Sequence, residues 1–409
     1  MRASTVFVLT EQGRFDEAIA AGSPFADDPE VDPEAALIAL LPLPFLLVAM
    51  GQTRRGQRIA DRAAALAEQH PRGGWARSRT LSAWASLRID AGREWPRTEA
   101  QLTARYRTAC EARDDELTGL IEALLGSLAL ARGAVRSALR WLREARAHLE
   151  LCDPRGATVA VLAATARASA QAGELAAADE CLAQAYAKAD ERRNNTIDRL
   201  ELMLASFEVS LARGELERAR RLALDYADTC GELPLEQARV LHEALRAAAP
   251  PRALSERLAA AAARTDAELA AAYAAHADAI ARNDGAALDR VAGEFEAIGA
   301  LLLAAETAAE SSVAHHHAGR ESSSRHAAAV SRRLAAACEG AQTPALAALA
   351  ADELTRRERE IALLAARGLS NEDIAHQLVV SIRTVESHLY HAMIKLGVER
   401  RQQLAGLLL

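Results

Sequence analysis

The chain has 409 residues with a formal net charge of −7, and half of its residues are apolar. Abundant alanine and leucine, only 4% aromatic residues and sparse glycine and proline are typical of packed helices, so we expect an all-α protein. The acidic balance excludes a broad basic surface that coats nucleic acid without sequence preference, but it allows a local DNA site.

The first notable segment is an apolar stretch at residues 35–50. It is shorter than the roughly 20 residues that a membrane helix needs, and it contains Pro42 and Pro44, so we expect a buried helix that is broken once. No segment resembles a signal peptide. Five widely spaced cysteines without a CxxC pair indicate reduced thiols in a cytoplasmic protein rather than disulfides or a metal site.

Glycines recur at nearly constant spacing through the first half of the chain. The intervals are 38 to 41 residues, and the positions are Gly13, Gly51, Gly92, Gly133, Gly173 and Gly214. Small or large apolar residues often follow at offsets of five, nine and twelve, as in Ala138, Leu142 and Ala145 after Gly133. Because these offsets share one helical face, we expect the glycine to close one helix and the alanine to let the next helix pack closely.

This pattern, G-x-x-x-x-A followed by a large apolar residue and alanine, resembles tetratricopeptide-type helical hairpins with a period longer than about 34 residues. The resemblance implies hairpins that stack into a superhelix with a concave face. The spacing weakens after residue 231, although Gly285 and Gly319 lie 34 residues apart. We expect two more irregular helix pairs and a capping helix through Cys338, so that the tetratricopeptide-like repeat domain spans residues 1–339.

Three consecutive histidines, His315, His316 and His317, lie within that region. Neighbouring residues on a helix point in different directions, so the three cannot ligate one ion as an i, i+4 pair can. We expect solvent-facing or partly packed rings and no metal site. The sequence GAQTP at residues 340–344 then interrupts the helical pattern, and a short alanine-leucine helix leads into Asp352. We therefore expect a linker at residues 340–351 and a second domain at residues 352–409.

The second domain divides into four helices by its own capping residues. Thr355 with Glu358 and Ser370 with Asp373 match capping boxes, and Ser381 can cap a third helix. The predicted helices span residues 356–367, 371–378, 382–396 and about 399–408, with a tight turn at residues 378–380. Two short helices joined by such a turn form a helix-turn-helix, whose second helix can enter the major groove of DNA.

The faces of the third helix follow from an advance of 100° per residue, with Val385 pointing inward. The outward face then carries Arg383, Ser387, Tyr390, His391 and Ile394, while one flank carries Thr384, His388 and Lys395 and the other Glu386. We assign the backbone phosphates to Thr384, His388, Lys395 and Arg400 or Arg401, and the base edges to Arg383, Ser387 and Tyr390. Glu386 can accept from cytosine N4 or pair with a nearby arginine, and both alternatives stay open.

The charge of this domain limits its affinity for DNA. It holds eight basic and eight acidic residues, and only from Ser381 onward do basic residues outnumber acidic ones, four to two. Binding by one copy should therefore be modest, and pairing of two DNA-binding domains would strengthen it. The predicted fourth helix offers Leu404, Leu407 and Leu408, which are too apolar to leave exposed.

These residues resemble the LuxR/NarL-type helix-turn-helix family, whose pattern is LTxRExE…LxAxGLSNxxIAxxLxxSxRTVxxHLxxxxxKLGV. The residues in register are Leu354, Thr355, Arg357, Glu358, Glu360, Gly368, Leu369, Ser370, Asn371, Ile374, Ala375, Leu378, Ser381, Arg383, Thr384, Val385, His388, Leu389, Lys395, Leu396, Gly397 and Val398. The resemblance implies a DNA-binding stretch from Asn371 to Tyr390, Val385 included, and dimerisation through the last helix. Glu386 and Tyr390 stand where other members can carry basic residues, so the operator sequence does not carry over.

Helical repeats before such a domain resemble the large ATP-dependent LuxR regulators of the MalT-like group, in which a nucleotide-binding module precedes repeats that sense an inducer or a partner. No G-x-x-x-x-G-K-[ST] loop occurs here, so the chain resembles the sensor and effector parts without the NTPase.

We therefore expect a cytoplasmic transcriptional regulator, nucleoid-associated when bound, that binds double-stranded promoter DNA as a homodimer. A small molecule or protein inducer would occupy the repeat groove, and we expect no cofactor, membrane partner or catalytic residue. The alternative is a helical-repeat interaction scaffold with a weak or vestigial DNA-binding domain. A nucleotide hydrolase is a third reading, but the chain lacks a phosphate loop, a carboxylate pair and a nucleophile cluster.

Overall fold

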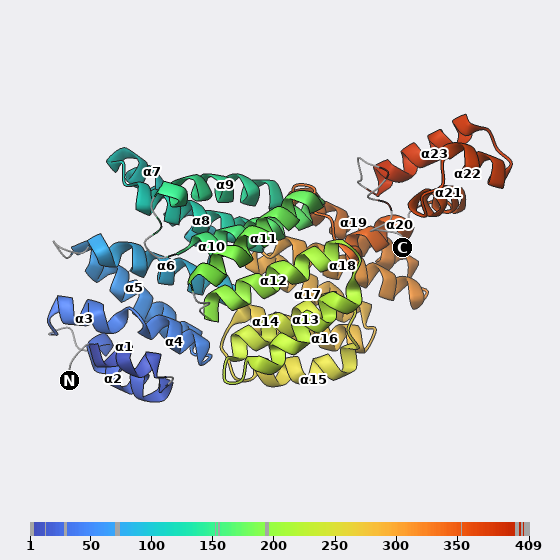
Figure 1. Ribbon diagram of the computed structural model, residues 1–409. Coiled ribbons are helices and arrows are strands. Elements are labelled where there is room, and N and C mark those ends of the chain that lie inside the picture. The colour runs from blue at the N-terminus through green and yellow to red at the C-terminus, as the bar shows by residue number, and fades with distance from the viewer. Residues whose placement is uncertain are drawn as a thin grey trace.

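The computed structural model describes residues 4–12, 14–27, 31–69, 74–151, 153, 156–192, 196–352, 354–396, 401 and 404. All regular structure in these residues is α-helical, which confirms the predicted all-α class. Figure 1 shows α1 to α20 packed as one array, with α21, α22 and α23 extending from one end of it.

The first half of the array consists of thirteen helices among the described residues. They are α1 (Ser4–Glu11), α2 (Phe15–Asp27), α3 (Pro33–Leu40), α4 (Leu43–Ala49), α5 (Thr53–Gln69), α6 (Gly74–Ala91), α7 (Trp95–Ala112), α8 (Asp115–Arg132), α9 (Val135–Leu151), α10 (Thr158–Gln171), α11 (Leu175–Arg192), α12 (Thr196–Ala212) and α13 (Leu216–Thr229). Helices α3 and α4 form the apolar stretch, which is broken once as predicted. No helix in the described part of the chain is long and apolar enough to cross a membrane.

Five of the six regularly spaced glycines lie in turns between paired helices. Gly51, Gly92, Gly133, Gly173 and Gly214 all have a left-handed backbone, with φ values of 84°, 76°, 87°, 75° and 76°. Such a residue closes a helix with little strain only when it lacks a Cβ. The alanines five positions after three of these glycines, Ala138, Ala178 and Ala219, are fully buried, so the predicted hairpin pattern is confirmed. Gly13 lies outside the described residues.

The second half of the array continues as helix pairs. They are α14 (Pro234–Arg246) with α15 (Pro251–Ala262), α16 (Glu268–Ala281) with α17 (Gly285–Ile298), and α18 (Leu301–His317) with α19 (Glu321–Ala337), followed by α20 (Pro344–Asp352). Three pairs therefore stand where two were expected. Two of the turns place Ala248 and Asn283 in the left-handed region, at φ values of 57° and 50°, so no glycine marks them in the sequence.

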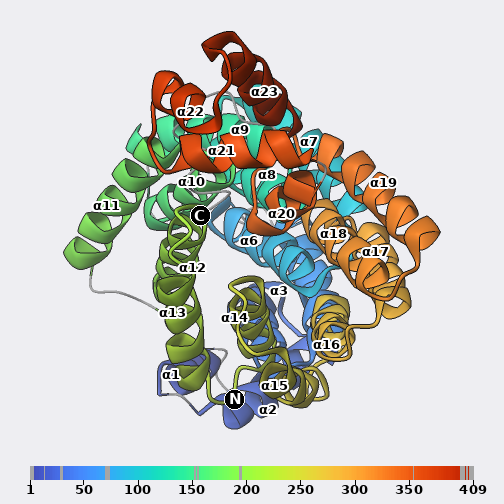
Figure 2. The same ribbon diagram turned by 90° about the vertical axis from the view of Figure 1, so that its right-hand side faces the viewer.

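The array coils so that its second half packs on its first. Helix α14 packs against α4, and α16 packs against α6. A Cβ built on Gly51 would lie 2.0 Å from the carbonyl oxygen of Arg264, and one on Gly133 would lie 2.4 Å from Cβ of Leu302. These glycines are therefore required twice, by the turn and by the close approach of a distant segment. Figure 2 shows the resulting ring of helices.

Two acidic residues of the second half cap helices of the first half. The Asp266 carboxylate accepts from the backbone N–H of Thr53 at 2.7 Å, at the start of α5. The Glu339 carboxylate accepts from the backbone N–H and the hydroxyl of Ser137, both at 2.7 Å, at the start of α9. We call these contacts the bridging caps. They join residues more than 200 positions apart at helix N-termini, where carboxylates are favoured.

A buried ionic cluster joins three inner helices. Arg246 on α14 contacts Glu243 at 2.7 Å, Glu306 on α18 at 3.0 Å and Glu208 on α12 at 3.3 Å. Burial opposes the charge on Arg246, but the carboxylates of Glu306, Glu208 and Glu243 raise its pKa well above the usual value. Burial also raises the pKa of Glu208. We call these four residues the Arg246 cluster.

The consecutive histidines behave differently from one another. His315 is buried, and its Nε2 lies 2.9 Å from the Asp289 carboxylate, whereas His316 and His317 are exposed. The three rings therefore do not converge, as the helical geometry predicted. The expectation of solvent-facing or partly packed rings is wrong for His315, whose buried ring pairs with Asp289. Among the described residues no group of histidine, cysteine and acidic side chains is arranged to hold a metal ion.

The remaining helices form a small domain of their own. They are α21 (Arg356–Ala366), α22 (Asn371–Leu378) and α23 (Ile382–Lys395). Both predicted capping boxes are present, Thr355 with Glu358 and Ser370 with Asp373, and the Ser381 hydroxyl accepts from the backbone N–H of Thr384. The predicted fourth helix lies in a region of which only Arg401 and Leu404 are described.

Candidate nucleic-acid interface

The small domain is built on an apolar core that fixes the orientation of α23. Val385, Leu389, Ala392 and Leu396 from that segment pack with apolar residues of α21 and α22, including Ile374. In the turn between α22 and α23, the Leu378 carbonyl accepts from the Arg357 guanidinium at 3.0 Å. These contacts hold the two helices of the helix-turn-helix in a fixed relation.

The outward face of α23 is the surface that the helical geometry predicted. Its side chains are exposed: Arg383, Ser387, Tyr390, His391 and Ile394. Glu386 is exposed on the neighbouring flank. Polar groups that point outward from the second helix of such a motif can reach the edges of bases in the major groove.

The flank assigned to phosphates is less exposed. Thr384 and His388 are half-buried, and the Thr384 hydroxyl lies 2.7 Å from the Ser381 hydroxyl. Both side chains sit at the border between the core and the outward face. Hydroxyl and imidazole groups in this position suit phosphate oxygens, which pass along the edge of an inserted helix.

Lys395 has a structural contact that the sequence analysis did not predict. Its ammonium group lies 2.6 Å from the Glu358 carboxylate, which also accepts from the backbone N–H of Thr355 in the capping box. The hydrogen bond from Lys395 holds the pKa of Glu358 at about 2. Lys395 thus ties the end of α23 to the start of α21. A capping-box glutamate facing the core was the available signal, because such a residue needs a cation when it is buried.

Asn371 and Arg401, both predicted to bind DNA, contact each other. The Arg401 guanidinium donates to the side-chain oxygen of Asn371 and to the carbonyl of Leu369. Arg401 therefore holds the start of α22 from the far end of the domain. Arg400 lies outside the described residues.

Two other predicted residues lie in the core and need correction. Val385 is fully buried, so it positions α23 and does not itself reach DNA. Leu404, assigned to dimerisation, is also fully buried and packs in the core of its own domain, so it is not available to a second copy. Leu407 and Leu408 lie outside the described residues.

Two exposed apolar residues at the start of α23 were not singled out from the sequence. Val379 in the turn is 90% exposed, and Ile382 in the first turn of the helix is 45% exposed. Val379 also has a left-handed backbone, with φ of 52°. A β-branched residue in that conformation is strained, and strain of this kind gathers at functional sites.

Comparison with known proteins agrees with this geometry. Residues 352–408 match the family described as bacterial regulatory proteins, luxR family. Over 51 residues the chain is 53% identical to a protein of Mycobacterium tuberculosis named as an HTH-type transcriptional regulator, a match covering 12% of this chain and 6% of that protein. Over 51 residues it is 47% identical to the oxygen regulatory protein NreC of Staphylococcus aureus, covering 12% and 24%. The C-terminal region is thus a LuxR-type helix-turn-helix domain, as predicted, and the chain spans a small part of these relatives.

The helical array has a weaker counterpart among solved structures. A crystal structure of a Rap protein complexed with competence and sporulation factor aligns with a TM-score of 0.47 and 11% sequence identity, covering 74% of this chain and 99% of that one. Nothing about ligand or partner follows from a match of this strength.

Proposed function

We propose that this protein is a transcriptional regulator that binds promoter DNA in a sequence-specific manner and whose helical array controls that binding. The observation that carries the proposal is the outward face of α23, where Arg383, Ser387 and Tyr390 are exposed on a LuxR-type domain. We propose that these three side chains contact base edges. The Arg383 guanidinium donates hydrogen bonds, and the hydroxyls of Ser387 and Tyr390 can donate or accept them, so together they can pair with most base edges in the major groove.

Phosphate contacts in the proposal come from groups around that face. Thr384 and His388 flank it, and Arg400 belongs to the same basic segment. Lys395 and Arg401 already hold the domain together through Glu358 and Asn371. These two residues would therefore support DNA binding in two ways: their positive charges attract the phosphates, and their contacts keep the helices of the domain in place.

Dimerisation remains part of the proposal for an electrostatic reason. The domain has no net charge, so one copy gains little from counterion release, and two linked copies would bind far more tightly. With Leu404 in the core, the proposed contact rests on Leu407 and Leu408.

The proposed sensor function draws support from the segment between the array and the small domain. Glu339 forms a bridging cap with Ser137, and the backbone N–H of Gln342 donates to the Gln171 carbonyl at 2.7 Å, directly before α20. We call the array closed when these two contacts are formed and loosened when they are broken. A ligand that binds one of these states more tightly than the other would raise the population of that state and would thereby change the position of α20.

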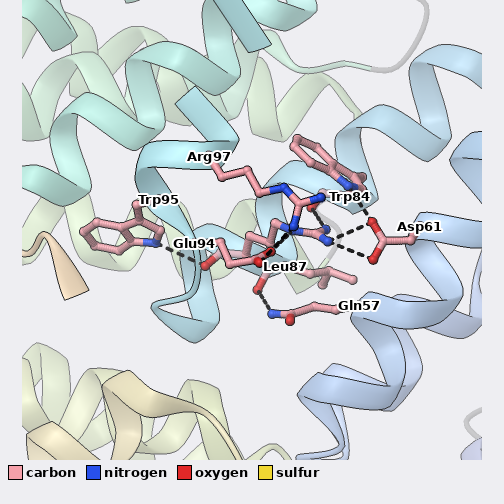
Figure 3. A network of polar contacts seen from close by, with 8 residues as sticks. Gln57, Asp61, Trp84, Leu87, Glu94, Trp95 and Arg97 are labelled. Carbon is pink, nitrogen blue, oxygen red and sulfur yellow. Dashed lines mark hydrogen bonds and ion pairs between the residues drawn. The ribbon is translucent and has the colours of Figure 1, made fainter. Parts of the chain in front are cut away.

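A cleft of about 410 Å³ lies where the two halves of the array meet, between the α6–α7 turn and helices α16 and α17. Trp95 forms part of its wall and is fixed by hydrogen bonds from its indole N–H to the carbonyls of Arg88 and Ile89, at 3.1 and 3.2 Å. Arg88 is fixed in turn by Asp61, at 2.8 Å. Figure 3 shows this Asp61 carboxylate, which also accepts from the indole N–H of Trp84 at 2.8 Å. We propose this rigid-walled cleft as the place where an inducer would act.

Selection of genomic fragments by the full chain, followed by fluorescence anisotropy at several salt concentrations, tests the proposal. We expect a recurring motif and an affinity that falls with salt. Ser387→Ala should change the preference at one base pair. Absence of salt-dependent binding to every selected fragment would reject the regulator and favour the interaction scaffold.

A further inference from the structure

On the basis of the proposed DNA binding, we propose that Glu386 is a specificity-determining residue that accepts a hydrogen bond from the N4 amino group of a cytosine in the major groove. The operator would then contain an obligatory C·G pair under the second turn of α23. This carboxylate gives the site a base preference that a basic residue at the same position would not give.

Glu386 is exposed on α23 beside the outward face, and no described residue pairs with its carboxylate. It is exposed on α23, one helical turn after Arg383 and one turn before Tyr390, which are both exposed as well. Within the part of the chain that the structure describes, the Glu386 carboxylate forms no hydrogen bond or ion pair. Among the residues that the structure describes, the pairing with an arginine that the sequence left open is not formed.

The chemistry of base edges then selects the partner. An ionised carboxylate only accepts hydrogen bonds. Guanine offers two acceptors in the major groove and thymine offers an acceptor and a methyl group, so both repel it or leave it unpaired. Adenine offers one donor, but its N7 acceptor lies beside that donor and faces the second carboxylate oxygen. Cytosine offers the N4 donor beside a C5–H, with no acceptor next to it in the groove.

The phosphate backbone offers no alternative to base contact. A carboxylate near phosphates is repelled, and no donor is available there. When another base replaces cytosine, the Glu386 carboxylate is buried in the complex without a hydrogen-bond donor. We therefore expect the affinity for such a site to be about tenfold lower.

Selection from a randomised duplex library by the full chain tests the proposal. The unmodified protein should select cytosine at one position. Glu386→Gln should shift that position toward adenine, because an amide can donate to N7 and accept from N6. Glu386→Ala should remove the preference there, while the other positions of the motif stay the same. Glu256→Gln is the control, because it removes the same charge from an exposed side chain of α15, outside the C-terminal domain, and should leave the motif unchanged.

The outcomes separate this inference from the proposed function. If the unmodified protein selects no motif, DNA-binding regulation itself fails. If it selects a motif that Glu386→Gln and Glu386→Ala both retain, with affinity altered evenly on all sequences, Glu386 acts only through its charge and the cytosine contact is overturned. Because Glu386 is exposed, unchanged thermal unfolding of both variants is expected, which makes misfolding easy to detect.

Discussion

The helical array and the C-terminal domain are both all-α, but they are stabilised in different ways. The array encloses charges: the Arg246 cluster joins α12, α14 and α18, and the bridging caps join residues more than 200 positions apart. The C-terminal domain uses local caps at Thr355, Ser370 and Ser381, and its outward helix face remains polar and exposed. The array thus encloses its charged groups between distant segments, whereas the small domain exposes polar groups on the outward face of α23, although Lys395 and Arg401 are engaged within it.

The largest expected effect tests the enclosed charges of the array. Arg246→Met leaves three carboxylates buried without their cation, so we expect the free energy of unfolding to fall by about 3–5 kcal/mol. Denaturant unfolding followed by tryptophan fluorescence measures this loss, because all four tryptophans lie in the array.

The pH dependence of that variant has a definite sign. Without Arg246, buried carboxylates such as Glu208 have a folded pKa raised by burial, so their protonated form is favoured in the folded state. The free energy of unfolding of the variant should therefore be greater at low pH. It should decline as the pH rises above 4.5, the ordinary pKa of a glutamate in the unfolded chain. Arg333→Met, which breaks the exposed pair with Glu296, is the matched control and should cost far less stability, because solvent screens an exposed ion pair. Equal losses from both variants would contradict the role of the cluster.

The next effect tests whether the small domain is stabilised separately. Leu404→Ala removes a fully buried side chain from the core of the C-terminal domain, and we expect a loss of about 2–4 kcal/mol. Hydrogen exchange of the full chain should show faster exchange in α21, α22 and α23 only. Weaker self-association with unchanged exchange would instead return Leu404 to a dimer interface.

The contrast between the two regions explains which features could be predicted from the sequence. Capping boxes, glycine turns and the exposure of the outward face of α23 depend on residues within a few positions of one another. A single sequence is therefore enough to predict them. The turn at Asn283 was missed because a residue other than glycine occupies the left-handed conformation there.

Contacts between distant residues could not be predicted in this way. Nothing local to Arg246 indicates that Glu208 and Glu306 will surround it, and the partners of Asp266 and Glu339 belong to the other half of the chain. In the candidate site the same limit applies. The exposure of the outward face followed from helical geometry, but the engagement of Lys395 by Glu358 depends on how α21 and α23 cross.

A smaller effect concerns that engagement. Glu358 has a pKa of about 2 in the folded domain and an ordinary value of 4.5, so its ionised form stabilises the domain fully above pH 4.5 and progressively less down to about pH 2. Because Lys395 is about a third exposed, solvent screening limits the contribution to about 1 kcal/mol.

Glu358→Gln should remove this pH dependence while it keeps the capping box, since glutamine also serves at that position. Lys395→Met should produce the same loss of stability and should also weaken DNA binding. Hydrogen exchange of α21 between pH 3 and 7 measures the first effect, with DNA binding followed at pH 7. A Lys395→Met variant with weakened DNA binding and unchanged exchange would show that the lysine contacts phosphate only.

The smallest expected effect tests the strain in the exposed turn of the helix-turn-helix. Val379 has a left-handed backbone and is almost fully exposed, so it gains little packing to offset the strain of a β-branched side chain in that conformation. Val379→Gly relieves the strain and adds chain entropy to the unfolded state, which leaves a net stabilisation of about 0.5–1 kcal/mol. Slower hydrogen exchange in α22 and α23 of the full chain would report this stabilisation.

Two further variants serve as controls. Val379→Asn should also stabilise the domain, because asparagine tolerates the left-handed backbone. Arg367→Gly, at an exposed residue with φ of −76°, should lower stability. If Val379→Gly instead speeds hydrogen exchange, the packing of the valine side chain stabilises the turn by more than the strain of its backbone costs.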